Sequence, residues 1–204
     1  MAKRVNKDDV DRLHDSNLHI PSRTIYIGSE HFSEDLQEAG TDSLMAERII
    51  KNIFLLESIS QDPITIIMSN PGGDWYYGMA IYDAIKLAKS HIIMKIYGMG
   101  MSMGSIILQA ADERVLAPNS RIMIHYGYMG MPETHTKIYQ KWSDECKKLD
   151  AWQDELFLSK IHKKHKDFKL KKLQKMLDFD TILTAKEAVE LGLADKILGE
   201  EENS

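Results

Sequence analysis

The chain has 204 residues, of which 43% are apolar and 28% charged, as in an ordinary soluble domain, so a fibrous or fully disordered chain is excluded. Its 26 basic and 31 acidic residues give a formal net charge of −5, so we expect neither nucleic acid nor a membrane surface as a partner. The single cysteine, Cys146, cannot form an internal disulfide, and the N-terminus is acidic where a signal peptide has its apolar core. We therefore expect a cytoplasmic protein.

The chain reads as one domain over residues 1–204, without long Gly/Ser/Pro linkers or repeats. Its expected parts are a polar, mobile N-terminal arm at 1–18, a core formed by 20–130 and 177–198, a helical appendage at 131–176, and a solvated tail at 199–204.

Hydrophobic periodicity and capping residues predict alternating strands and helices. The predicted strands are 23–28, 63–68, 91–97, 114–116, 122–125 and 196–198. The predicted helices are one from Asp42 or Ser43 to about 56, then 78–89, 102–111, 137–162, and one that starts at a capping box at 184–187 and ends at Gly192. Strands that alternate with helices favour parallel βαβ units and an α/β fold.

The long helix predicted over 137–162 carries an apolar stripe at spacings of three and four residues. Its members are Ile138, Trp142, Cys146, Leu149, Trp152 and Leu156. Residues 131–177 hold 12 lysines against 7 acidic residues, a net of +5, so the remaining residues carry −10. An apolar stripe on a projecting, basic helix needs a partner surface, so we expect a homo-oligomer.

The sequence Gly-Met-Ser-Met-Gly at 100–104 lies where a predicted strand gives way to a helix. Glycines on both sides of Ser102 allow a sharp turn that exposes its hydroxyl at the helix N-terminus, where a developing anion is stabilised. The alternative is a serine that only caps the helix, with glycines that allow close packing.

A nucleophilic serine needs a base, and His125 ends the apolar strand 122–124, where it could be held rigidly for proton transfer. The alternative for His125 is a hydrogen-bonded core histidine. His162 and His165 have a spacing that suggests a metal, but the lysines around them favour a solvated face, so we expect no metal and no cofactor. Asp178 and Asp180 are both candidates for the orienting carboxylate, and spacing does not rank them.

The sequence Asn-Pro-Gly-Gly at 70–73 follows a predicted strand and can turn a backbone N–H towards a carbonyl oxygen. Together with the N–H of Met103, it would form an oxyanion hole with two donors. The alternative is an ordinary Pro-Gly turn.

Several blocks of the sequence resemble the Clp protease proteolytic subunit, in order and at that family's spacing. They are Pro-Gly-Gly at 71–73, Gly-Met-Ala-Ile-Tyr-Asp at 78–83, the segment 98–104, Leu-Ala-Pro-Asn-Ser-Arg-Ile-Met-Ile-His at 116–125, and the segments 183–188 and 192–196. The resemblance extends over about 20–198. It implies a Clp/crotonase-type fold, in which a core of stacked βαβ units carries a protruding helical handle.

The resemblance also implies functional residues. Those for catalysis are Ser102 as nucleophile, His125 as base, Asp180 rather than Asp178 as orienting acid, and Gly73 and Met103 as oxyanion donors. Those for the substrate cleft are Gly72, Trp75, Tyr126 and Gly127. The implied assembly is a homo-oligomer of heptameric rings stacked in pairs through the handle. Unfolded proteins or peptides would be the substrates, delivered by a hexameric AAA+ unfoldase that binds ATP.

The chain departs from the family pattern at several positions. They are the aromatic residues at 75–77, the segment 126–130 after the histidine, Thr65, Ile67 and Lys95 at expected docking positions, and Phe179 at a position that often links the rings. These departures motivate a rival hypothesis, a non-catalytic or partner-dependent subunit of a mixed ring.

A second rival is an α/β-hydrolase esterase, suggested by the Gly-x-Ser-x-Gly pattern. In that fold the acid precedes the histidine, which here requires Asp150 or Asp154 followed by His162 or His165.

Overall fold

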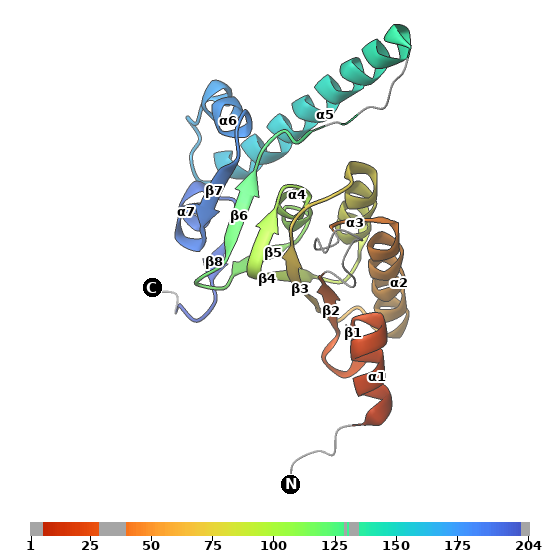
Figure 1. Cartoon of the computed structure of the whole chain (residues 1–204). Helices are drawn as coiled ribbons and strands as arrows, with labels where there is room; N and C mark the ends of the chain where they lie inside the picture. Colours follow the sequence, from red (N-terminus) through yellow and green to blue (C-terminus); the bar gives the residue numbers. More distant parts are fainter. Residues whose placement is uncertain (1–5, 29–39, 129, 131–134, 201–204) are drawn as a thin grey trace.

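The computed structural model describes residues 6–28, 40–128, 130 and 135–200 (Figure 1). Its strands are β1 (Leu18–His19), β2 (Thr24–Ile27), β3 (Ile64–Asn70), β4 (Ile92–Met101), β5 (Glu113–Leu116), β6 (Arg121–Ile124), β7 (Thr181–Thr184) and β8 (Lys196–Ile197). Its helices are α1 (Lys7–Ser16), α2 (Ser43–Ile59), α3 (Trp75–Leu87), α4 (Met103–Leu108), α5 (Thr136–His162), α6 (Leu170–Leu177) and α7 (Ala185–Leu191).

The strands of the described residues form one mixed sheet in the order β1-β2-β3-β4-β5-β8, to which β6 is added beside β4, and β7 beside β6. The pairs β2–β3, β3–β4, β4–β5, β4–β6 and β5–β8 are parallel, and helices connect the strands of the first three. The pairs β1–β2 and β6–β7 are antiparallel. The expected α/β class with a parallel sheet is confirmed, and the two antiparallel additions were not foreseen.

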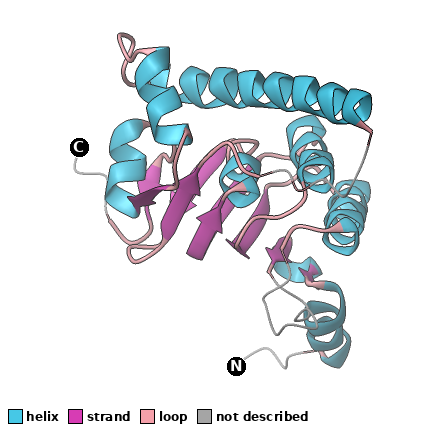
Figure 2. Cartoon of the chain, turned by 45° about the horizontal axis from the view of Figure 1, so that its top comes forward, coloured by secondary structure: helices cyan, strands magenta, loops and turns pink. Residues whose placement is uncertain are grey.

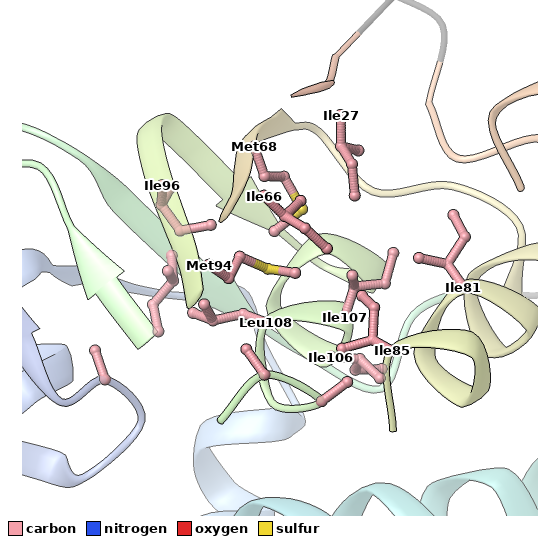
Figure 3. Packing of buried hydrophobic residues seen from close by; sticks show 14 of the residues in the cluster. Ile27, Ile66, Met68, Ile81, Ile85, Met94, Ile96, Ile106, Ile107 and Leu108 are labelled. Carbon is pink, nitrogen blue, oxygen red and sulfur yellow. The ribbon is translucent and has the colours of Figure 1, made fainter. Parts of the chain in front are cut away.

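The core lies between this sheet and α2, α3 and α4, and it also takes in buried residues of α5, α6 and α7. Figure 3 shows the part of it formed by β3, β4, α3 and α4. Alternate residues of β3 point into it, and Ile64, Ile66 and Met68 are fully buried. Each such side chain contributes about 1.5–3 kcal/mol through the water it no longer contacts. Thr65 and Ile67, which point to the opposite face, are only partly covered within the subunit.

Helix α5 confirms the predicted long helix, and its 27 residues span about 40 Å. Its buried residues, Gln153, Leu156, Phe157 and Ile161, all lie in its second half. The first half stands clear of the body in Figure 1, and Figure 2 shows the helix passing over the layer of shorter helices. An appendage held at only one end agrees with the expected protruding handle.

The ring of Trp152 attaches α5 to the body. It makes edge-on contacts with Trp75 and Tyr82 of α3, with ring centroids 5.7 and 5.4 Å apart. Edge-to-face aromatic pairs of this kind add stability beyond the area that they bury. The aromatic residues of α3 therefore fix the direction in which α5 projects.

The capping predictions are confirmed. Thr184 and Glu187 form the expected capping box of α7, and Gly192 ends that helix in the left-handed conformation. Of the two candidates for the N-cap of α2, Asp42 is the one whose side chain accepts a hydrogen bond from Met45 N–H. Helix α3 begins at Trp75, before the predicted residue 78, because the Asp74 side chain caps it by accepting from Tyr77 N–H.

Several short elements were missed, strand β1 among them. Residues 7–16, inside the expected arm, form helix α1, whose N-cap is Asn6. Helix α6 and strand β7 occupy 170–177 and 181–184, which were not assigned to helix or strand. Helix α1 is polar and buries no residue, so it has no apolar stripe. Helix α6 does carry one, with Leu170, Leu173 and Leu177 at spacings of three and four, and this signal could have found it. Strand β7 owes its conformation to pairing with β6. Within the described part of the chain, no helix is both long and apolar enough to cross a membrane.

Candidate active site

Ser102 occupies a sharp turn between β4 and α4. Its φ of 49° lies in a region that residues other than glycine rarely adopt, and such strain persists only where the surroundings enforce it. Here Met101 pairs with Met123 of β6, and Ser102 N–H donates to the Met123 carbonyl over 2.9 Å. On the other side, Ser105 of α4 donates both its N–H and its hydroxyl to the Ser102 carbonyl. The strand and the helix thus hold the serine in the turn.

His125 is the first residue after β6, and its Nε2 lies 2.7 Å from Ser102 Oγ. Because β6 pairs with β4, the end of one strand places the imidazole beside the end of the other. The imidazole is well buried, with 11% of its side chain exposed, and the exposed ring of Tyr128 contacts it edge-on. This geometry lets the serine hydroxyl donate to Nε2.

Asp180 Oδ1 lies 2.9 Å from His125 Nδ1, on the far side of the ring from Ser102. The aspartate precedes β7, and the antiparallel pairing of Ile124 with Thr181 places it beside the histidine. With the Nδ1 proton donated to the carboxylate, Nε2 is free to accept from Ser102. Of the two candidates Asp178 and Asp180, this contact is made by Asp180.

The Pro-Gly-Gly segment passes directly beside Ser102. A Cβ placed on Gly72 would lie 2.7 Å from Ser102 Cβ, and the φ of Gly72 is +109°, so this close approach requires glycine. Gly72 N–H donates to the buried Asn70 side chain over 2.7 Å, which holds the turn.

Gly73 lies in a short parallel pairing with Thr41. Thr41 N–H donates to the Gly72 carbonyl and Asp74 N–H donates to the Thr41 carbonyl, so both bonds use the same edge of the segment. Because successive residues of an extended chain point their N–H groups to opposite edges, the N–H of Gly73 faces away from Thr41. Met103 is the first residue of α4, whose first N–H groups have no acceptor within the helix.

The residues expected in the substrate cleft have different surroundings. Gly72 lies beside Ser102, and Gly127 is exposed, with open space around its Cα. Trp75 instead packs against Trp152, and Tyr126 donates its hydroxyl to Asp154 Oδ1 over 2.7 Å. Trp75 and Tyr126 are therefore bound to α5, a contact that the sequence did not indicate because their partners lie tens of residues away.

The rival histidines have other partners. His162 Nε2 lies 2.9 Å from the Phe168 carbonyl, and His165 Nε2 lies 2.6 Å from the Glu190 carbonyl. Asp154 contacts Tyr126 and Gln174, whereas the histidine beside Ser102 is His125. The α/β-hydrolase arrangement is therefore wrong. In the ranges that the structure describes, no three histidine, cysteine or acidic side chains are grouped as a metal site would require.

A comparison with known protein families shows independently which family this fold and sequence belong to. The model of the family described as Clp protease matches residues 36–201, which is most of the chain. The chain belongs to the Clp protease family. The expected fold, a mixed α/β core with a parallel sheet and a long projecting helix, is thereby confirmed as that of a family of serine peptidases.

Curated members of the Clp protease family are similar over most of their length. The chain is 33% identical over 182 residues to the ATP-dependent Clp protease proteolytic subunit of Deinococcus radiodurans, covering 88% of this chain and 81% of that protein. It is 30% identical over 178 residues to the ATP-dependent Clp protease proteolytic subunit 2 of Prochlorococcus marinus, covering 86% of this chain and 81% of that protein.

Proposed function

We propose that this Clp-family chain is an active serine endopeptidase that cleaves unfolded polypeptides and peptides. The observation that carries the proposal is the continuous hydrogen-bonded series from Ser102 Oγ through His125 to Asp180, with contacts of 2.7 and 2.9 Å. It joins residues from three elements of the fold, which makes a merely structural role for each of them hard to maintain.

In this mechanism Ser102 Oγ attacks the carbonyl carbon of the scissile peptide bond while His125 Nε2 takes the hydroxyl proton. Asp180 keeps the proton on Nδ1 and stabilises the imidazolium that forms. His125 then returns the proton to the leaving amine, which leaves an acyl-enzyme on Ser102. Water, activated by the same histidine, attacks the ester and releases the acid product and the free serine.

The negative charge that develops on the carbonyl oxygen needs preorganised donors. We assign this role to the N–H groups of Gly73 and Met103, which lie on the two segments that meet at Ser102. Removing one such donor typically lowers kcat by about 100- to 1000-fold. Gly72 and Gly127 would line the path of the substrate backbone, with Trp75 and Tyr126 forming the border on the side of α5.

We further propose that the chain works in heptameric rings stacked in pairs and receives substrates from an AAA+ unfoldase. Ile138, Tyr139 and Trp142 are exposed on the projecting half of α5, where a second copy could cover them. The names of the relatives describe ATP-dependent proteases, which supports a partner that binds ATP. The single cysteine fits work in the cytoplasm.

The decisive experiment is labelling with a fluorophosphonate, together with hydrolysis of a fluorogenic peptide. We expect an adduct on Ser102 in the assembled protein, and loss of labelling and hydrolysis in Ser102→Ala and His125→Ala. Ser58→Ala, at an exposed serine of α2, is the matched control. No adduct on Ser102, or hydrolysis retained by Ser102→Ala, would contradict the proposal.

The rival, a subunit that becomes active only in a mixed ring, is favoured by the departures at Thr65, Lys95 and Phe179. Native mass measurement of the isolated protein tests it. A homo-oligomer that hydrolyses peptide by itself excludes the rival, whereas an inert homo-oligomer or monomer supports it.

A further inference from the structure

Tyr126 follows the histidine of the site directly, and three hydrogen bonds hold it to the handle side of the molecule. Its hydroxyl donates to Asp154 Oδ1 of α5 over 2.7 Å, and its N–H donates to the Leu177 carbonyl at the end of α6 over 2.9 Å. Its carbonyl accepts from Gln153 Nε2 of α5 over 3.4 Å. The residue after the base is thus tied to both helices of the handle region.

Asp154 extends this contact to α6. Its second oxygen, Oδ2, accepts from Gln174 Nε2 over 2.9 Å, so one carboxylate joins Tyr126 to α6. Helix α6 ends at Leu177, only three residues before Asp180. The hydroxyl of Thr181, on the other side of Asp180, donates to the Met176 carbonyl over 2.7 Å. The short loop that carries the acid is therefore fixed at both ends.

These contacts form a closed series. From His125 the chain continues to Tyr126, whose hydroxyl contacts Asp154, and Asp154 contacts Gln174 of α6. From α6 the short loop leads to Asp180, which contacts His125. Asp180 itself is 53% exposed, so burial does little to hold it. A half-exposed carboxylate keeps a fixed position against the imidazole only if its loop is held from elsewhere.

We propose that Tyr126, Asp154 and Gln174 are positioning residues that hold the Asp180 loop in register with His125. The proposal deepens the proposed function, because the register it concerns is that of the base and the orienting acid. It also makes the second half of α5 part of the support of the active site, so that a shift of the handle would move the acid relative to the base.

The protonation of Tyr126 suits this role. Burial, the hydrogen bond to Asp154 and the nearby charges of Asp154, Asp150 and Asp178 raise the pKa of Tyr126 far above its usual value. The hydroxyl therefore stays protonated, and so remains a donor, at neutral and moderately alkaline pH.

The test compares Tyr126→Phe and Asp154→Ala with two matched controls at exposed positions, Tyr97→Phe on β4 and Asp144→Ala on α5. In the assembled protein we expect Tyr126→Phe and Asp154→Ala to lower kcat about 10-fold with KM within about twofold of wild type. Both variants keep the ring that borders the cleft and lose only the contact that holds the acid loop. The controls are expected to keep kcat. Asp154→Asn can still accept from Tyr126 and pair with a rotated Gln174 amide, so it should retain most of the activity.

A double variant sharpens the test. If Tyr126 and Asp154 act through one contact, the combination of Tyr126→Phe and Asp154→Ala lowers kcat no further than the larger single loss. Losses that multiply, or a kcat of Tyr126→Phe within twofold of wild type, would overturn the inference.

Hydrogen–deuterium exchange separates this inference from the proposed function, because it needs no activity. We expect faster exchange of backbone amides in 124–128 and 177–182 in Tyr126→Phe and Asp154→Ala, and unchanged exchange in the controls. Unchanged exchange in Tyr126→Phe refutes the coupling, even if labelling shows that wild type is active. If fluorophosphonate does not label the wild-type protein, but Tyr126→Phe still exchanges these amides faster than wild type, the coupling is supported and only the proposed function is contradicted.

Discussion

Ser102 and Asp180 reach the same histidine from two regions that are built differently. The serine belongs to the layered body, where Ile66, Met68 and Ile96 are fully buried and where the strained turn is enclosed by strand and helix. The aspartate belongs to the handle side, where α5 is half exposed and α6 is short, and where polar side chains make the connections.

This difference in construction determines how each region responds to an amino-acid substitution. In the body, positions are fixed by close packing, which tolerates almost no change in volume. On the handle side Phe157, Leu173 and Leu177 are also buried, but Tyr126 and the Asp180 loop are held by a few hydrogen bonds, which can be exchanged at a smaller cost in free energy. We therefore expect substitutions of buried apolar residues in either region to act on folding, and substitutions of exposed or hydrogen-bonding residues on the handle side to act on assembly or catalysis.

The largest expected effect contrasts the two halves of α5. Phe157 is fully buried, so Phe157→Ala leaves a cavity and should lower the free energy of unfolding by about 3–5 kcal/mol. Trp142 is exposed on the projecting half, so Trp142→Ala should change that free energy by less than about 0.5 kcal/mol while lowering the mass of the assembly. Urea denaturation followed by circular dichroism, and native mass measurement, check both values. Equal loss of unfolding free energy in the two variants would show that the two halves of α5 do not differ in this way.

Within the body, the segment beside the serine should tolerate no added atom. A Cβ on Gly73 would lie 2.4 Å from Thr41 N and 2.5 Å from Thr41 O, both backbone atoms that cannot move aside. Gly73→Ala is expected to lower the rate of fluorophosphonate labelling at least about 100-fold, because it displaces a proposed oxyanion donor. Gly28→Ala, where the nearest atom would be 3.9 Å away, is the control. Normal labelling of Gly73→Ala would show that this segment does not serve the site.

The capping box next to the acid loop should contribute a moderate amount. Thr184 accepts from Glu187 N–H, and Glu187 accepts from Thr184 N–H and hydroxyl, which also lowers the pKa of the glutamate. Thr184→Ala should cost about 1 kcal/mol of unfolding free energy. Thr136→Ala, at the exposed start of α5, should cost clearly less, and denaturation midpoints compare the two. If Thr136→Ala lowered the unfolding free energy as much as Thr184→Ala does, the capping box would contribute no more than an ordinary exposed threonine.

The last effect is a dependence of stability on pH near the C-terminal end of α5. Burial, followed by the charge of Arg114, lowers the pKa of Lys160 to about 8, against an ordinary value of 10.5. Between these values the unfolded chain binds the proton and the folded chain does not, so this lysine destabilises the fold at neutral pH and less so as the pH rises. The stability of wild type relative to Lys160→Met should therefore increase from pH 7.5 to 9.5. A constant difference would contradict the lowered pKa.

Much of the fold followed from local pattern. The parallel strands, the long helix and the capping box are encoded by side-chain periods and caps over neighbouring residues, and these predictions are confirmed for β3, α5 and α7. Helix α1 escaped prediction because it is polar and buries no residue, and strand β7 because its four residues are too few for a period to emerge.

By itself, the sequence determined the class of fold and proposed Ser102 and His125, because glycine-flanked turns and strand ends are properties of a few consecutive residues. The spacing of residues did not rank Asp178 against Asp180, and only the family resemblance implied Asp180. The tertiary structure shows that Asp180 contacts the histidine, and this contact depends on the register of β7 against β6. The same holds for Tyr126 and Asp154, which are 28 residues apart and meet through the packing of α5. Contacts between distant residues depend on how whole elements pack, and no local pattern records that packing.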